Sequence, residues 1–244
     1  HQLLESIINK LFLILSIFIG LTGCSSIELD AVPSSKQVTQ RILNLGLSHE
    51  ENLVEASKLS SAHMVSVVTL QLTNARDEKI QADKDLKESE DFATMVTILQ
   101  NNSQFISSEI SESSNNVILD TDKDLINYFI EGFKDQSNGI VTHKLNISIT
   151  YNSKNRRDYY VISFCDKWNN CEQSELELYV TSANAANCNN DACDFTEIME
   201  IELSDGFLRD AIGKGFSMRV TSNKKTNKIT ISKPYLMGYL RVAQ

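Results

Sequence analysis

The sequence predicts an α+β protein, in which a helical N-terminal region precedes an antiparallel β-sheet or small β-sandwich closed by short helices. In the first half, apolar residues recur at helical spacing, and a run of mixed charges lies at 75–91. From about residue 140 the period becomes two, as in a half-buried strand. Residues 37–137 are therefore expected to be mainly helical, and residues 138–244 to form a β-rich domain stapled by disulfides.

The N-terminal segment places Lys10 before an apolar run at 11–21, which is followed by small residues and Cys24. This run is shorter than the roughly 20 apolar residues that a membrane-spanning helix needs. The motif Leu21-Thr22-Gly23-Cys24 resembles the lipobox of bacterial lipoproteins. The resemblance implies that residues 1–23 are a signal peptide, that Cys24 is acylated after cleavage, and that 24–36 tether the protein to a lipid bilayer.

Two details of this segment bear on its processing. Ile8-Asn9-Lys10 looks like the opening of a signal peptide with Ile in place of Met, so residues 1–7 are expected to lie upstream of the natural start. Ser25 follows the cysteine. In lipoproteins of the enteric type this resembles an outer-membrane address, which implies an anchor in the outer membrane with the protein facing the periplasm.

A capping box predicts where one helix of this region begins. Ser48 and Glu51 have the spacing of a capping box, in which each side chain accepts a hydrogen bond from the backbone N–H of the other. Residues 64–73 allow two interpretations, because they continue an apolar helical stripe but are also β-branched and alternate like a strand. We favour the helix. Residues 75–91 then form a solvated helix supported by spaced opposite charges.

The second part of this region is predicted from two patterns. Residues 101–116 are rich in Asn and Ser, which predicts a surface loop or a fraying helix. A further helix is expected after Asp122, its cap, because the following apolar side chains fall on one helical face before Asn138-Gly139 ends it. These side chains are Leu125, Ile126, Phe129, Ile130 and Phe133.

The β-rich domain opens with the clearest strand in the sequence, Val141 to Tyr151, in which apolar and polar residues alternate. A polar turn and a returning strand at 160–164 predict a hairpin. A short helix is expected after Ser204 and a closing helix at Pro234, which suits a first helical turn. The remaining strands are expected at 176–180, 197–203, 216–220 and 228–232.

Four cysteines follow Cys24, and all lie in the β-rich domain: Cys165, Cys171, Cys188 and Cys193. An even number in an exported chain indicates a disulfide framework with three possible connectivities. We favour Cys165–Cys171 and Cys188–Cys193, because each pair brackets a short polar segment. No C-x-x-C spacing occurs and no histidine is close to a cysteine in sequence, so neither a metal nor another cofactor is expected.

Charge and motifs narrow the range of functions. The net charge of −9 disfavours nucleic acid as a partner. No G-x-S-x-G motif and no carboxylate pair in an apolar setting is present. Asp120, Asp122 and Asp124 are spaced as in a calcium loop, but its glycine and final glutamate are missing, so a helix cap is the better interpretation. Trp168 and Tyr159, near the first cysteine pair, could form a contact patch.

A second resemblance covers about a fifth of the chain, residues 188–240. The pattern consists of the Cys188 and Cys193 pair, Thr196-Glu197, Leu203-Ser204, Gly215 and the segment 235–240. It is similar to uncharacterised proteobacterial envelope lipoproteins and, more faintly, to periplasmic proteins of the invasion-associated locus B type. This resemblance implies an envelope β-domain and supplies no activity.

The sequence thus favours a membrane-anchored envelope lipoprotein with a non-catalytic binding, scaffolding or assembly role and an envelope protein as its partner. The alternative is an envelope enzyme, such as a cell-wall hydrolase, whose catalytic residues are dispersed along the chain.

Overall fold

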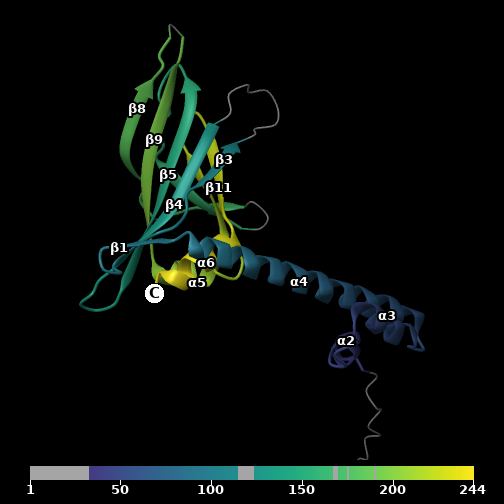
Figure 1. Cartoon of the computed structure of the whole chain (residues 1–244). Coiled ribbons are helices and arrows are strands. Elements are labelled where there is room, and N and C mark those ends of the chain that lie inside the picture. Colours follow the sequence, from purple (N-terminus) through teal and green to yellow (C-terminus); the bar gives the residue numbers. More distant parts are fainter. Residues whose placement is uncertain (1–32, 115–123, 167–169, 175, 190) are drawn as a thin grey trace, which may run out of the picture. The chain divides into compact units, whose positions relative to one another are not determined.

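The computed structural model describes residues 33–114, 124–166, 170–174, 176–189 and 191–244 (Figure 1). The helices are α2 (Ser35–Leu43), α3 (His49–Ser57), α4 (Ala62–Thr94), α5 (Asp205–Ala211) and α6 (Lys233–Val242). The first strands are β1 (Thr97–Leu99), β2 (Gln104–Ile106), β3 (Ile110–Ser114), β4 (Asp124–Lys134) and β5 (Val141–Ser153). The later strands are β6 (Val161–Cys165), β7 (Cys171–Gln173), β8 (Tyr179–Ala186), β9 (Cys193–Leu203), β10 (Phe216–Thr221) and β11 (Thr226–Ile231). The predicted α+β class, with N-terminal helices before antiparallel sheets, is confirmed.

The chain divides into two compact units, with the boundary between Asp77 and Glu78, within α4. In the N-terminal unit, α2, α3 and the first half of α4 share a small apolar core, which contains Val38, Ile42, Ala56, Val68 and Leu72. Ser48 caps α3 in the predicted capping box with Glu51. Thr39 donates its hydroxyl hydrogen bond to Gln71 over 2.6 Å, which joins α2 to α4.

The ambiguous segment 64–73 is helical, as favoured. Val68 and Leu72, one helical turn apart, are buried together in the core of the N-terminal unit, whereas Leu70 between them is 61% exposed. Burial at spacing four selects the helix over the strand. Residues 75–91 continue it as the predicted charged helix.

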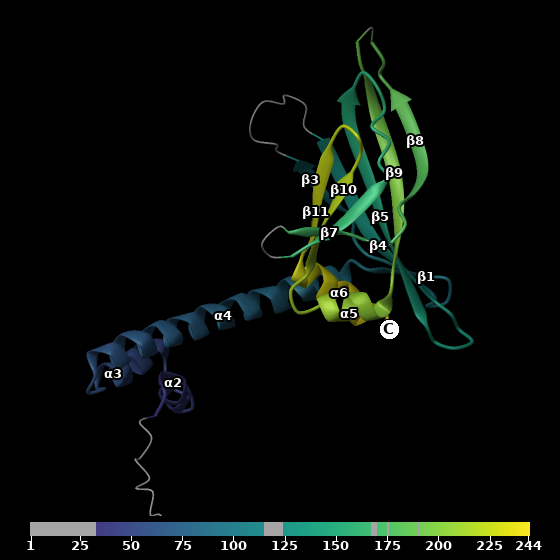
Figure 2. The same ribbon diagram turned by 180° about the vertical axis from the view of Figure 1, so that it is seen from behind.

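The C-terminal unit contains two antiparallel sheets (Figure 2). The larger sheet has the strand order β1-β2-β4-β5-β9-β8, with β3 beside β4, and the smaller one has the order β11-β10-β6-β7. Inward-facing side chains from both sheets and from α6 form one continuous core. Helices α5 and α6 lie together at one end of the strands.

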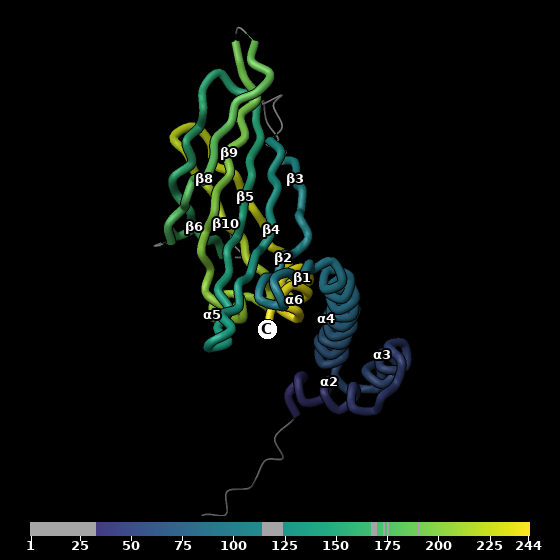
Figure 3. Tube along the Cα trace, turned by 60° about the vertical axis from the view of Figure 1, so that its left-hand side comes forward, coloured from purple at the N-terminus to yellow at the C-terminus, as the bar shows by residue number. Residues whose placement is uncertain are grey.

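Helix α6 packs closely on the last turns of α4 (Figure 3). A Cβ atom at Gly238 would lie 2.6 Å from both the Ser89 carbonyl oxygen and the Phe92 Cβ, so only glycine permits this approach. The Phe92 ring meets Tyr235 edge-on at 5.3 Å, and Lys233 Nζ lies 2.8 Å from Asp85. This contact fastens the end of α4 to the β-domain.

The expected helix after Asp122 is wrong, because Asp124–Lys134 is strand β4. Its side chains alternate in burial: Leu125 is exposed, and Ile126, Tyr128 and Ile130 are buried. The same apolar residues satisfy a helical and a strand period, and pairing along β5 decides between them. Asp124 is accordingly no helix cap, while Asp120 and Asp122 lie outside the described residues.

The β-rich domain begins earlier than the expected residue 138, because segments expected to be helix or loop form strands. Strands β1 to β4 fall inside the region expected to be mainly helical, and β2 and β3 replace the loop expected at 101–116. The β-rich domain therefore begins directly after α4. The polar residues of β3 are tolerated because, among the described strands, it pairs only with β4 and lies at the border of the sheet.

The expected hairpin between β5 and the strand at 160–164 is also wrong. β5 pairs with β4 and β9, whereas β6 pairs with β10 and β7 in the other sheet. The turn carries Arg157, whose side chain is buried between the sheets, and the chain changes sheets there. The strand expected at 176–180 begins later, as β8. Strands β9, β10 and β11, α5 after Ser204 and α6 with Pro234 in its first turn are confirmed, and β10 and β11 form a hairpin.

Both local disulfides, Cys165–Cys171 and Cys188–Cys193, are present as favoured. The first joins β6 to β7, and the second closes the loop between β8 and β9. Cys24 and the whole expected signal peptide lie outside the described residues. None of the described helices is both long and apolar enough to cross a membrane.

Candidate functional site

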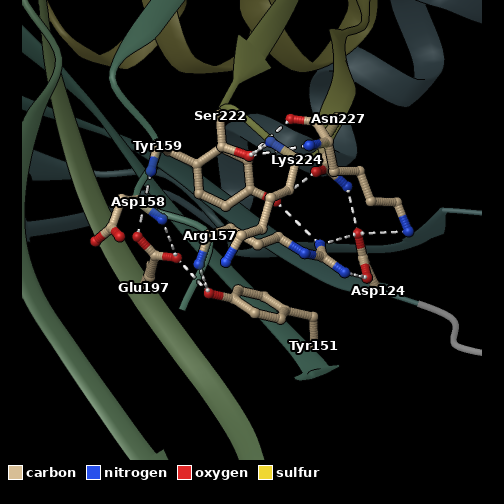
Figure 4. A network of polar contacts seen from close by, with 10 residues as sticks. Asp124, Tyr151, Arg157, Asp158, Tyr159, Glu197, Ser222, Lys224 and Asn227 are labelled. Carbon is tan, nitrogen blue, oxygen red and sulfur yellow. Dashed lines mark hydrogen bonds and ion pairs between the residues drawn. The ribbon is translucent and has the colours of Figure 1, made fainter. Parts of the chain in front are cut away.

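A closed cluster of polar side chains, here the Asp124 cluster, lies between the two sheets (Figure 4). Asp124 is 0% exposed and accepts both guanidinium nitrogens of Arg157, at 2.6 and 3.0 Å. Asn227 donates to the same carboxylate at 2.7 Å, and Lys225 Nζ lies 3.3 Å from it. Tyr159 in turn donates to Asn227 Oδ1 at 2.6 Å. These contacts join β4, the segment before β6 and the β10–β11 hairpin.

The other end of the cluster is formed by a second buried carboxylate, Glu197 of β9. It accepts the Tyr151 hydroxyl and the backbone N–H groups of Asp158 and Tyr159, at 3.3 and 3.4 Å. The Tyr151 oxygen accepts the Arg157 backbone N–H at 2.8 Å, and the Arg157 guanidinium lies 3.9 Å from the centre of the Tyr151 ring. Both carboxylates of the cluster are thus compensated by positive charge or by donors.

The surroundings of Asp124, Tyr151 and Tyr159 determine which of these groups is charged. Burial alone raises the pKa of Asp124, but hydrogen bonds from Arg157 and Asn227 outweigh it and hold the pKa below the ordinary value. Burial raises the pKa of Tyr151, and raises that of Tyr159 to about 12. At neutral pH the carboxylate is therefore charged and the phenols are neutral. General acid–base catalysis needs a group whose pKa lies near the working pH, and the shifts move the pKa values of Asp124, Tyr151 and Tyr159 away from neutrality. The cluster is therefore better suited to holding the sheets together.

A second row of polar groups, the His143 clasp, crosses α5, β5 and α6. His143 is 1% exposed; its Nδ1 accepts from the Tyr239 hydroxyl at 2.8 Å, and its Nε2 donates to Asp205 at 3.2 Å. We assign this tautomer because Asp205 is a carboxylate, which can only accept. Arg209 donates to the other Asp205 oxygen at 2.6 Å and is the main cause of its lowered pKa. Burial lowers the pKa of His143, so the imidazole is neutral.

The clasp has the composition of a hydrolase relay, a carboxylate, a histidine and a hydroxyl, but its geometry is closed. The Tyr239 hydroxyl is the group that would have to react. It is buried against Gly132, where any Cβ atom would collide with it. Asp205 and Arg209 border a surface hollow of about 350 Å³, yet none of the described residues that line this hollow carries a hydroxyl group. Among the described residues no three His, Cys, Asp or Glu side chains are placed to hold a metal ion.

An open groove of about 780 Å³ lies beside α5, at one end of the smaller sheet. Its floor consists of Phe164 from β6, Phe207 from α5 and Phe216 from β10, and we call it the phenylalanine groove. The ring centroids lie 4.9 Å apart for Phe164 and Phe207, and 5.1 Å apart for Phe207 and Phe216. All three rings are only partly buried. They present an apolar surface of the kind that lines ligand and peptide sites.

The rim of the groove is polar and is built by local chain geometry. Asp166, Asp210 and Lys214 lie around it and are exposed. Gly215 has φ +71°, and a Cβ atom there would collide with the Ile231 carbonyl oxygen. Glycine therefore lets the chain leave α5 and enter β10 directly beside β11. The apolar floor with a few polar groups at its edge can bind an apolar side chain, and the described lining contains no histidine that could act as a general base.

Most of the residues that the sequence singled out lie outside the phenylalanine groove. Cys165 lines the phenylalanine groove, and its disulfide fixes the adjoining β6–β7 hairpin. The Cys188–Cys193 disulfide lies in the β8–β9 loop. Tyr159 is 2% exposed and cannot belong to a contact patch, while Trp168 lies outside the described residues. All three phenylalanines lie in elements that the sequence predicts, the strands at 160–164 and 216–220 and the helix after Ser204, but their convergence depends on the unpredicted crossing of β6 to the smaller sheet.

Comparison with known protein families and with curated proteins found no match to this chain.

Proposed function

We propose that the protein is a lipid-anchored component of the bacterial envelope, whose β-domain binds a partner protein without catalysing a reaction. The observation that carries the binding role is the open phenylalanine groove. Three clustered rings on a protein surface mark an interaction site more strongly than scattered apolar residues do. The partner would insert an apolar side chain between the rings and contact the polar rim with its neighbouring residues.

The polar clusters support a non-catalytic role. The ionisable side chains Asp124, Glu197 and His143 are buried and lie in closed networks whose hydrogen bonds join elements of the fold. An envelope hydrolase would need such groups in an open cleft with room for a substrate. The phenylalanine groove has the room and lacks the chemistry, so binding explains it better.

A capture experiment tests the binding role. Phe207→Ala removes the central ring, and Tyr160→Ala removes an exposed aromatic side chain outside the groove as a matched control. We expect the wild-type protein and the Tyr160 variant to retain the same partner from crosslinked native membranes, and the Phe207 variant to lose it. Equal retention by all three would contradict binding at the groove. Hydrolysis of purified cell wall by the wild-type protein would overturn the non-catalytic role.

The anchor is tested separately. If Cys24 carries the acyl chains, Cys24→Ser abolishes incorporation of a labelled fatty acid and releases the protein from membranes. Because two or more acyl chains are needed for stable anchoring, loss of the attachment site should have a large effect on partitioning. Unchanged labelling of the serine variant would disprove the anchor, without affecting the capture result at the groove.

A further inference from the structure

We propose that β8 pairs antiparallel with β8 of a second copy of this chain, so that the larger sheets of two molecules become continuous. β8 is the last strand on its side of the larger sheet and pairs with β9 alone among the strands that the structure describes. A border strand exposes a row of backbone donors and acceptors on its outer side. Those groups are a template for another strand.

The other sheet borders are less suited to accept a strand. β1 and β7 contain three residues each, too few for a stable ladder. β3 has five residues and carries Glu112. β11 presents Lys228, and the backbone carbonyl oxygen of its Thr230 already accepts the Tyr128 hydroxyl at 2.9 Å. Short strands, charged side chains and covered backbone groups are the usual protections of sheet borders.

β8 lacks these protections. It has eight residues, YVTSANAA, and none of them is charged. Its side chains are exposed or partly exposed along its whole length, with Tyr179 at 49% and Val180 at 43%. Two copies of a chain with net charge −9 repel each other over most contacts. An antiparallel pair of β8 strands places no carboxylates opposite each other, so this border is open to a second copy.

The sequence of β8 is also complementary to itself. Its bulky residues lie at one end and its alanines at the other, and Thr181 is the extra residue of an irregularity between Val180 and Ser182. In an antiparallel register that is centred on Ala183 and leaves Thr181 of each copy unpaired, Tyr179 would lie opposite Ala186 of the partner copy and Val180 opposite its Ala185. Ser182 would lie opposite Asn184. Each large side chain thus meets a small one, as a two-fold symmetric interface requires.

Charge-reversal pairs test this proposal in the full chain. Ser182→Lys with Asn184→Lys would place like charges opposite each other in the homodimer, and Ser182→Glu with Asn184→Glu would do the same with the opposite sign. We expect light scattering to show a concentration-dependent wild-type dimer and a dissociation constant raised about tenfold or more in each variant. An equimolar mixture of the two variants should restore the dimer, which also shows that both have folded.

Three results would overturn the proposal. They are a wild-type chain that stays monomeric at its highest soluble concentration, variants that dimerise as well as the wild type, and a mixture that does not associate although each variant keeps the wild-type circular dichroism spectrum. The proposal does not depend on the groove, because the groove residues belong to α5 and the smaller sheet, whereas β8 belongs to the larger sheet.

Discussion

The Asp124 cluster and the phenylalanine groove both lie in the β-domain and differ in almost every physical respect. The cluster brings charged and polar groups together in the interior, with each carboxylate held by several donors. The groove brings three apolar rings together at the surface, with no large apolar partner covering them among the described residues. The cluster is therefore polar and buried, whereas the groove is apolar and borders the solvent.

The difference separates two roles. A buried charge persists only where its partners are built into the fold, so the Asp124 cluster depends on the exact placement of three separate segments and specifies the packing of the sheets. A partly buried aromatic cluster contributes less to stability than a fully buried one, and covering it with a partner lowers the free energy further. Changes in the cluster should therefore alter folding, whereas changes in the groove should alter binding.

The largest effect is expected from Arg157→Met. It leaves the buried Asp124 carboxylate without its bidentate partner, and breaking a buried ion pair costs about 3–5 kcal/mol of unfolding free energy. Chemical denaturation measures the loss. Arg156→Met is the matched control, because Arg156 is adjacent in sequence but exposed, and it should change stability by less than about 0.5 kcal/mol. Equal effects of the two substitutions would show that the Asp124 cluster is not the source of stability.

The next effect concerns pH. Since the folded-state pKa of Asp124 lies below its ordinary value, its stabilisation is present at neutral pH and is lost as the pH falls through that folded-state pKa. Asp124→Asn should therefore be less stable than the wild type at pH 7, and the difference should shrink as the solution is acidified. Urea denaturation over a pH series measures this difference. A difference that stays constant would mean that Asp124 does not titrate with folding.

Removal of the Cys165–Cys171 disulfide, which borders the phenylalanine groove, should have a smaller effect on folding and a specific effect on binding. Cys165→Ser with Cys171→Ser opens a short loop and should cost about 2 kcal/mol. Because Cys165 lines the phenylalanine groove, partner capture should also weaken. Cys188→Ser with Cys193→Ser opens a loop of similar length away from the groove. That variant should lose similar stability and keep its partner, and loss of capture in both would point to general unfolding.

The smallest effect on stability is expected in the groove itself. Phe207→Ala removes a ring that is only partly buried, so it should cost about 1–2 kcal/mol, less than the truncation of a fully buried phenylalanine. Thermal unfolding gives the cost, and the capture experiment gives the loss of binding. A destabilisation as large as that of Arg157→Met would mean that the rings form part of the core and not a binding surface.

Much of the fold follows from local patterns. The capping box at Ser48, the alternation in β5 and the spacing of the cysteines are each satisfied within a few residues, and each is confirmed. The failures occur where distant pairing decides. The residues of β4 fit two periods, and only β5 beside them selects the strand.

The candidate site was less predictable than the fold. Asp124 and Arg157 are 33 positions apart, and their pairing follows from a chain that changes sheets at the turn after β5. No local pattern marks that crossing. The three phenylalanines come from different elements and meet only because β6 lies beside β10.

Site-specific photocrosslinking in living cells tests the central claim most directly. The photoreactive analogue p-benzoylphenylalanine would replace Phe207 in one variant and Tyr160 in another. We predict a light-dependent adduct of one defined mass from position 207 and none from position 160. Absence of any adduct at 207, or the same adduct from both positions, would contradict the assignment of the phenylalanine groove as the binding site.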